Sequence, residues 1–356
     1  MHLKIAVLGG DGVGPEVTRE AQRVLERVCL RFHHQVTFTL KEVGGAALLS
    51  SDDPLPNDTL QACISSKAVL LGAVGGPAFD NYPSHLRPER GLLRLRHELG
   101  VFANLRPATC FPAIEDSSPL RPEIVHGTDI LIVRELLGGL YFGEPRLIHG
   151  PEGSRLATDT MRYGEREIER ITRVAFDLAR SRRKKVTSVD KANVLDCSRL
   201  WRDVVNRVAR DYHDVKLSHL YVDSAAMALV ARPADFDVIV TENMFGDILS
   251  DQAGAVVGSI GMLASASIGG PVALYEPVHG SAPDIAGTGA ANPLGAILSV
   301  AMMLRYSFHL EAEAAAVEAA VVKVLNAGHR TRDLAKPGQK TITTPEMGAQ
   351  VAAAIQ

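Results

Sequence analysis

The sequence predicts an α/β protein, and three observations lead to this prediction. Strand-like apolar runs alternate with helix-compatible segments along the chain, which is the pattern of a sheet covered by layers of helices. The 356 residues include 31 glycines, so many tight turns can connect these segments. A chain of this length is also expected to form about two domains, each with its own core.

The composition narrows the classes of function. The formal net charge is −3, so we expect neither a nucleic-acid partner nor binding to an acidic membrane surface. No apolar run of 18 residues and no signal peptide is visible, so we expect no membrane association. The four cysteines are scattered without a C-x-x-C pair, which favours a reducing compartment, and we expect a cytoplasmic protein.

The predicted elements follow from the periodicity of apolar residues. In the first half of the chain we predict strands at 4–8, 37–43, 68–73 and 130–133. Helices are predicted from the glycine-rich turn after residue 8 to about 28, at 56–66 and at 91–99, with a Pro- and Ser-rich loop at 107–123. In the second half we predict a hairpin or arm at 140–159, helices at 164–182, 196–210, 293–306 and 311–327, strands at 185–189, 220–222 and 238–240, and a loop at 274–294.

The glycine-rich turn GGDGVGPEV is weak support for a Rossmann fold. A G-x-G-x-x-G register that starts at Gly10 meets Pro15 at the position of the last glycine. The turn therefore predicts a strand-to-helix connection and does not by itself predict a dinucleotide site.

Two carboxylates follow the predicted strand at 238–240. Asp247 and Asp251 are four residues apart in a helix-compatible segment, so they share one helix face and repel one another unless a cation lies between them. Hard cations prefer oxygen ligands, so the pair predicts a Mg²⁺ or Mn²⁺ site. The alternative is that both residues decorate an exposed helix face.

Three arginines lie in or beside predicted turns, namely Arg96, Arg106 and Arg134. A guanidinium group binds a carboxylate through two parallel hydrogen bonds, so three of them together suggest a dicarboxylate substrate. Lys191 and Tyr141 could move protons near a metal ion, although each alone is more often a surface lysine or a packed aromatic residue.

The segment EPVHGSAPDIAGTGAANP, at 276–293, has the character of a nucleotide-binding loop. Its small residues allow the main chain to approach a ligand closely, and Asp284 could accept hydrogen bonds from ribose hydroxyls. The alternative is a long structural loop, but loops of this length in compact domains are usually functional or disordered.

Taken together, these segments resemble the β-decarboxylating dehydrogenases, the family of isopropylmalate and isocitrate dehydrogenases. The resemblance covers nearly the whole chain, and its motifs occur in the order of the family. They are GDGVGPEV, GLLRLR, FANLRP, LIVREL, GGLYFGEPR, TSVDKANVL, YVDSAAM, TENMFGDILSD and EPVHGSAPDIAG.

The resemblance implies a role for each candidate residue. Arg96, Arg106 and Arg134 would hold the carboxylates of a 3-substituted malate, and Tyr141 and Lys191 would be the catalytic acid and base. Asp223, Asp247 and Asp251 would bind Mg²⁺ or Mn²⁺, with Asp223 also touching the substrate and coming, like Lys191, from the other subunit of a homodimer with shared active sites. The residues expected to contact the C3 substituent are Glu89, Leu92, Leu93 and Val194. Those expected to bind NAD are Glu276, His279, Gly280, Ser281, Ala282, Pro283, Asp284, Ile285 and Asn292.

The fold implied by the resemblance is a two-domain isopropylmalate dehydrogenase-like fold with a central cleft, not a Rossmann fold. A cofactor-binding terminal domain would comprise 1–101 and 258–356. A domain for substrate, metal and dimerisation would comprise 102–257, with an arm near 140–160.

The implied activity is NAD-dependent oxidative decarboxylation of 3-isopropylmalate to 4-methyl-2-oxopentanoate, in leucine biosynthesis. A D-malate or tartrate dehydrogenase of the same family is the first alternative, and Arg94 adds a charge that could favour a more polar substrate. The apolar pair Leu92 and Leu93 argues against that alternative. A non-catalytic paralogue that acts as a binding subunit is the second alternative.

Overall fold

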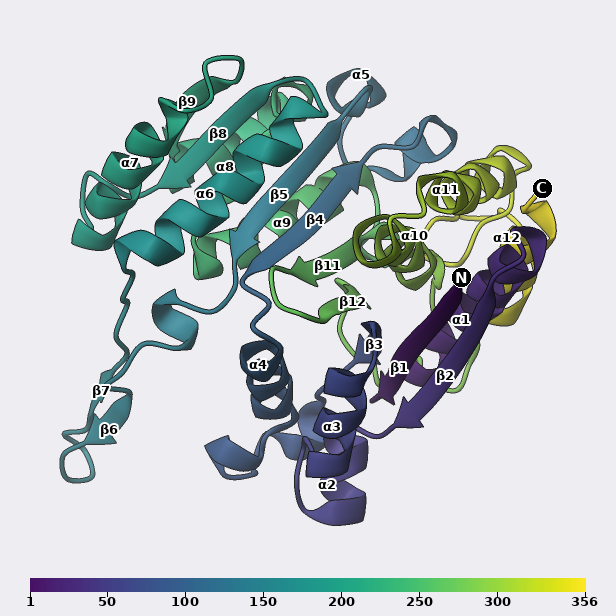
Figure 1. The fold of residues 1–356 in the computed structure, drawn as a ribbon, viewed down its shortest axis with the longest axis horizontal. Coiled ribbons are helices and arrows are strands. Elements are labelled where there is room, and N and C mark those ends of the chain that lie inside the picture. Colours follow the sequence, from purple (N-terminus) through teal and green to yellow (C-terminus); the bar gives the residue numbers. More distant parts are fainter.

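A computed structural model describes residues 1–356, which form one large mixed sheet with helices on both faces (Figure 1). The strands of this sheet are β1 (His2–Gly10), β2 (Gln35–Lys41), β3 (Ala68–Ala73), β4 (Ala103–Thr109), β5 (Asp129–Glu135), β8 (Lys185–Asp190), β9 (Lys216–Tyr221), β10 (Val238–Thr241), β11 (Ala264–Ile268) and β12 (Ala273–Pro277). A separate hairpin consists of β6 (Leu147–His149) and β7 (Leu156–Thr158). The α-helices are α1 (Gly14–Arg31), α2 (Gly45–Ser51), α3 (Asn57–Ser65), α4 (Pro88–Leu99), α5 (Pro122–Val125), α6 (Glu165–Arg180), α7 (Asp196–Ala209), α8 (Val222–Ala231), α9 (Asn243–Val257), α10 (Leu294–Phe308), α11 (Glu311–Asn326) and α12 (Thr344–Ala354).

The strand order is β2-β1-β3-β12-β11-β4-β5-β10-β8-β9. The outer strands on each side pair in parallel, whereas β11 is antiparallel to both of its neighbours and β4 is antiparallel to β5. Two parallel blocks are thus joined through antiparallel strands in the centre of the sheet. This order and its antiparallel centre exclude the open parallel sheet of a Rossmann fold.

The two faces of the sheet carry different helices. The largest core cluster joins one face to α1, α6, α7, α10, α11 and α12. On the other face, α8 and α9 cover the middle strands, and α3 and α4 cover the strands near the N-terminus. Arg96 lies on α4, and Asp247 and Asp251 lie on α9, so these candidate residues come from helices of this second face.

Most predicted elements are confirmed, because their apolar periodicity matches the faces they bury. For example, all six residues of β3 are buried, which agrees with the continuous apolar run that predicted it. The elements that the sequence did not predict are α2, α5, α12, β4, β11 and β12, and only the end of β9 was predicted.

Two predicted loops are wrong in part. The loop at 107–123 begins inside β4, where Pro107 pairs with Leu131 of β5. The neighbouring strand β11 pairs with β4 only as far as Leu105, so the missing N–H of Pro107 falls at a local strand edge. The loop at 274–294 also begins inside a strand, because β12 runs to Pro277.

The predicted domain division stays a prediction. Strands from 1–101 and 258–356 form one contiguous half of the sheet, and strands from 102–257 form the other half. The predicted arm corresponds to the β6–β7 hairpin, which extends away from the body of the molecule (Figure 1). None of the helices is both long and apolar enough to cross a membrane.

Candidate active site

Helix α9 brings an acidic side chain against two arginines from the central strands. Arg134 of β5 pairs with Asp247, and it also donates to Asn243 Oδ1 from Nε at 3.0 Å and from Nη2 at 2.7 Å. Arg106 of β4 places Nη1 3.3 Å from Asp247 Oδ1 and 3.3 Å from Asp251 Oδ1. The structure therefore brings together four of the predicted residues, with a positive charge shared between the two carboxylates.

The electrostatics of this cluster keep Asp247 ionised. Burial alone would raise the pKa of Asp247, but Arg134, Arg106 and a hydrogen bond from Tyr141 outweigh it and hold the pKa below its ordinary value. Asp251 differs: burial raises its pKa, and the charge of Asp247 adds to the effect against the influence of Arg106. Burial lowers the pKa of Arg106 to about 10, and Arg134 acts in the same direction.

Tyr141 completes the cluster. Its hydroxyl donates to Asp247 Oδ2 at 2.5 Å, and the Arg134 guanidinium lies 5.3 Å from the centre of its ring. Burial, followed by the hydrogen bond to Asp247, raises the pKa of Tyr141. The phenol is therefore held protonated and directed at Asp247.

Arg96 approaches from α4, on the other half of the sheet. Its Nη2 donates to Glu276 Oε1 of β12 at 2.8 Å, and its Nε is buried without a hydrogen-bond partner. A buried donor without a partner is costly, so this group fits an acceptor that is supplied by a ligand. Glu276 was predicted to bind the cofactor, and within the chain it is the counter-ion of Arg96.

Lys191 and Asp223 form a separate pair. Lys191 Nζ lies 2.6 Å from Asp223 Oδ1, and this hydrogen bond is the first cause of the lowered pKa of Asp223. No hydrogen bond or ion pair within the chain joins either residue to Asp247. No group of three or more His, Cys, Asp or Glu side chains in the chain could hold a metal ion. Asp247 and Asp251 both approach Arg106 Nη1 from one face of α9, so their carboxylates fit two ligands of a divalent cation.

The predicted nucleotide loop lies beside the first glycine-rich turn. Val13 N donates to Ser281 O at 2.8 Å, and Gly12 has a positive φ and no room for a Cβ next to that carbonyl. Asp11 fixes the surrounding loops by accepting from the backbone N–H groups of Gly45, Ala46 and Gly75, each at 2.8 Å.

In the loop at 276–293, the residues predicted to bind NAD include both polar groups and backbone with open space beside it. The Nε2 atom of His279 is buried without a partner, and a Cβ on Gly280 would meet no atom within 4 Å. Asp284 is exposed, whereas Asn292 is buried and donates to Asp333 Oδ2 at 3.0 Å. Ala282 has a positive φ of 38°. An orphaned buried imidazole beside an open backbone fits a nucleotide ligand.

The predicted apolar residues occupy different surroundings. Leu92 packs against the core cluster that contains Leu95, whereas Leu93 lines a pocket with Phe142. Glu89 is exposed, and Val194 is 61% exposed on the loop after β8. Arg94 donates to Asp53 Oδ2 at 3.0 Å, so its charge is already paired.

The sequence reading missed the residues that orient the arginines. Asn243 receives two hydrogen bonds from Arg134 and donates to Leu136 O at 3.1 Å and to Gly138 O at 3.0 Å. Asn104 and Ser250 hold Arg106 in the same way. Asn243 could have been found, because it lies four residues before Asp247 and therefore on the same helix face.

A model of the isocitrate/isopropylmalate dehydrogenase family matches residues 4–351. The chain belongs to this family. Its enzymes are β-decarboxylating dehydrogenases, which in general depend on NAD and require a metal ion.

Individual members of the family are similar to this chain over nearly their whole length. The chain is 57% identical to the 3-isopropylmalate dehydrogenase of Geobacillus kaustophilus, over 99% of this chain and 96% of the relative. It is 59% identical to the 3-isopropylmalate dehydrogenase of Moorella thermoacetica, over 98% of each chain. Among solved structures, isocitrate dehydrogenase from Methylococcus capsulatus superposes with a TM-score of 0.89 at 35% identity, over 100% of this chain and 99% of that one.

Proposed function

We propose that the chain catalyses the NAD-dependent oxidative decarboxylation of 3-isopropylmalate to 4-methyl-2-oxopentanoate, a step of leucine biosynthesis, in the cytoplasm. The observation that best supports the reaction class is the charge balance of the site. Arg96, Arg106 and Arg134 face Glu276, Asp247 and Asp251, so three positive charges oppose three negative ones. The two negative charges of a dicarboxylate and the two positive charges of a divalent cation cancel, so their joint binding leaves the net charge of the site unchanged.

Each residue has a role in this proposal. The three arginines bind and orient the malate carboxylates, and the unpartnered Nε of Arg96 gains an acceptor. Lys191 of the partner subunit takes the proton from the C2 hydroxyl. Tyr141 delivers a proton to C3 after CO₂ has left.

The cofactors supply the remaining chemistry. The loop at 276–293 would hold NAD, which would supply the hydride acceptor for oxidation at C2. A divalent cation, Mg²⁺ or Mn²⁺, when held by Asp247, Asp251 and the Asp223 of the partner, supplies Lewis-acid stabilisation for charge that develops on the C2 oxygen. Asp284 is exposed and can accept from both hydroxyls of the adenosine ribose, whereas it would repel the 2′-phosphate of NADP.

Relatives named 3-isopropylmalate dehydrogenase support the choice of substrate, because they share 57–59% of residues with the chain. Leu92 and Leu93 on α4 provide apolar surface for a branched substituent. Burying an isopropyl group contributes roughly 2 kcal/mol, or about a thirtyfold preference over D-malate.

The test is to measure kcat/KM for 3-isopropylmalate, D-malate, tartrate and isocitrate with NAD and with NADP in the presence of Mn²⁺. We expect the thirtyfold preference for 3-isopropylmalate and a preference for NAD. Leu93→Ala should narrow the gap to D-malate, while Leu30→Ala, at an exposed site, should not. If kcat/KM for D-malate equals that for 3-isopropylmalate, the result favours the alternative substrate. If no acid gives NADH, the result favours a non-catalytic subunit.

A further inference from the structure

A second cavity lies on the face of the sheet opposite the arginines, with a volume of about 480 Å³. Its floor includes Pro107 of β4 and Leu131 of β5, which pair with one another. Successive side chains of a strand point to opposite faces, so these two residues lie behind Arg106 and its neighbours in the active site. The cavity is therefore separate from the proposed active site but shares its two central strands.

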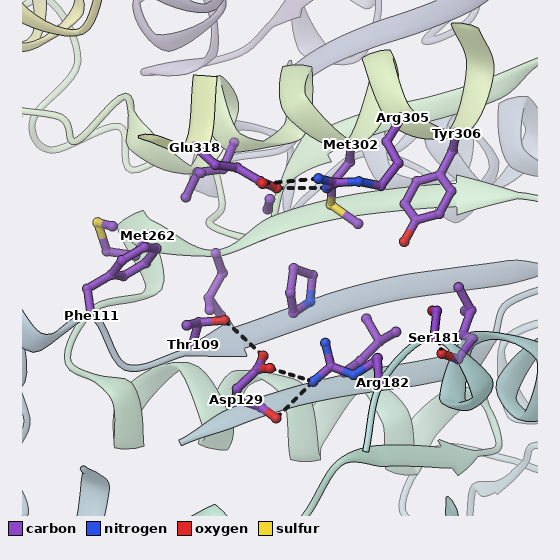
Figure 2. A pocket seen from close by; sticks show the side chains of 16 residues that line it. Thr109, Phe111, Asp129, Ser181, Arg182, Met262, Met302, Arg305, Tyr306 and Glu318 are labelled. Atoms are coloured by element: carbon purple, nitrogen blue, oxygen red, sulfur yellow. Dashed lines mark hydrogen bonds and ion pairs between the residues drawn. The ribbon is translucent and has the colours of Figure 1, made fainter. Parts of the chain in front are cut away.

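The walls of the cavity come from two distant parts of the chain. Met302 and Tyr306 project from α10, and Ser181 lies in the turn after α6 (Figure 2). Leu178, near the end of α6, also lines the cavity. Met262 and Phe111 close the apolar side. The cavity thus fills the gap between the helices that cover the two halves of the sheet.

The charged residues at the cavity are already paired. Arg305 binds Glu318 through two hydrogen bonds, at 2.7 and 3.0 Å, and also pairs with Glu311. Arg182 lies 2.9 Å from Asp129 Oδ2 and 2.9 Å from Asp237 Oδ1. Each arginine has two carboxylate partners, so the cavity presents no free positive charge to an anion.

One polar group remains available. Figure 2 shows the Tyr306 hydroxyl turned toward the cavity, with no hydrogen bond to the other lining residues. Most of the remaining lining is apolar, from Leu298, Leu263, Ala264 and the residues named above. A cavity of this size, with an apolar surface between paired charges and one polar group left unpaired, is typical of a small-molecule site.

We propose that this cavity binds an uncharged amphiphilic small molecule, with its apolar body over Pro107 and Leu131 and a hydrogen-bond acceptor directed at the Tyr306 hydroxyl. Such a ligand contacts α10 and α6 at once and fixes their separation. Because its floor is the reverse side of the strands that carry Arg106 and Arg134, bound ligand changes the affinity for the dicarboxylate substrate. This inference does not depend on which 3-substituted malate is the substrate.

Binding is tested by saturation-transfer NMR with three probes of similar shape: 2-acetylnaphthalene, 2-ethylnaphthalene and 2-naphthoate. We expect the neutral ketone to bind at least tenfold more tightly than the anion. Tyr306→Phe should weaken the ketone about 3- to 10-fold, the loss of one hydrogen bond, and leave 2-ethylnaphthalene unchanged. Met302→Trp should fill the cavity and abolish binding of all probes, whereas Val322→Trp, on the exposed side of α11, should not.

Equal affinity for 2-naphthoate, or binding that neither cavity variant alters, would overturn the assignment of the site. Tyr306→Phe keeps the test decisive if Met302→Trp does not fold. For the effect on substrate affinity, initial rates are measured with saturating 2-acetylnaphthalene. We expect at least a twofold change in the substrate KM for the unmodified enzyme and none for Met302→Trp. Unchanged KM in the unmodified enzyme at saturation would overturn the coupling.

Discussion

At the scale of single residues, Asp247 is the carboxylate on which most of the site converges. It accepts from Tyr141 and pairs with Arg106 and Arg134, and its pKa is held low against burial. We predict that Asp247→Asn lowers kcat/KM at least 100-fold and weakens Mn²⁺ binding at least tenfold, because the amide supplies no charge for a cation. Rates with EDTA and added Mn²⁺, and calorimetric Mn²⁺ titration, provide the measurement.

The control for this prediction is Asp235→Asn, at a side chain that is 70% exposed in an ion pair with Arg232. It should keep the activity and metal affinity of the unmodified protein. Full turnover in excess EDTA would show that the metal assignment is wrong.

Glu135 provides a prediction for pH. It is fully buried and accepts from Leu137 N at 3.2 Å and from Gly138 N at 2.8 Å. Burial nevertheless raises its pKa from 4.5 to about 7, against these two hydrogen bonds and the charge of Arg170. Below pH 4.5 the carboxyl is protonated in both the folded and unfolded states. Between pH 4.5 and 7 only the unfolded state ionises, so the free energy of unfolding decreases as pH rises.

Glu135 should lower the free energy of unfolding by on the order of 3 kcal/mol between pH 4.5 and 7. Above pH 7 no further loss from this group is expected. Urea unfolding gives the free energy of unfolding of the unmodified protein and of Glu135→Gln at each pH from 4.5 to 8. The loss is measured as the change with pH in the difference between these two free energies. Glu123→Gln, at an exposed site, should show no such change. Parallel pH profiles for the unmodified protein and Glu135→Gln would contradict the prediction.

At the scale of secondary structure, the close packing of α9 on β5 depends on a glycine. A Cβ at Gly246 would lie 2.6 Å from Cγ and 2.7 Å from Cβ of Arg134. Gly246→Ala favours the helix by about 1 kcal/mol but displaces the arginine, so we predict at least a tenfold increase in substrate KM. Steady-state kinetics, with thermal unfolding to check the fold, measures this effect.

Gly254 in the same helix provides a matched control. A Cβ there would meet the end of the Leu263 side chain, which can rotate away, and not an arginine. Gly254→Ala should change stability while leaving KM unaltered. The prediction fails if both variants change KM equally.

At the scale of the whole molecule, apolar side chains remain exposed on α8, α9 and the β6–β7 hairpin. Met227 is 66% exposed, Ile248 58% and Ile148 70%. Together with the separation of the Lys191–Asp223 pair from Asp247, these surfaces favour a homodimer whose active sites combine residues of both chains.

We predict that inactive Lys191→Ala and inactive Asp247→Asn chains regain activity when mixed under subunit exchange. One of the two sites in each heterodimer would then contain an intact set of residues, so up to one quarter of the normal activity is expected at equal mixing and random exchange. Native mass spectrometry verifies heterodimer formation. Confirmed heterodimers without activity would refute shared sites.

The sequence alone determined the features that depend on local spacing. Apolar periodicity identified most helices and strands, because a buried face imposes its repeat on the chain. The four-residue spacing of Asp247 and Asp251 placed both on one helix face, and the small residues of 276–293 marked a backbone open to a ligand. The nine motifs in their order identified the family, whose model matches residues 4–351.

Only the tertiary structure decided which distant residues meet. It paired Glu276 with Arg96, and it set Asn243 against Arg134, because strand order and helix packing carry no local signal. The sequence also could not show that β4 continues through Pro107. A proline has no N–H for pairing and is tolerated here because β11 no longer pairs with this part of β4, which depends on the strand order. The cavity behind the arginines also arises from the gap between α6 and α10, which depends on how non-local elements cover the sheet and not on any one segment.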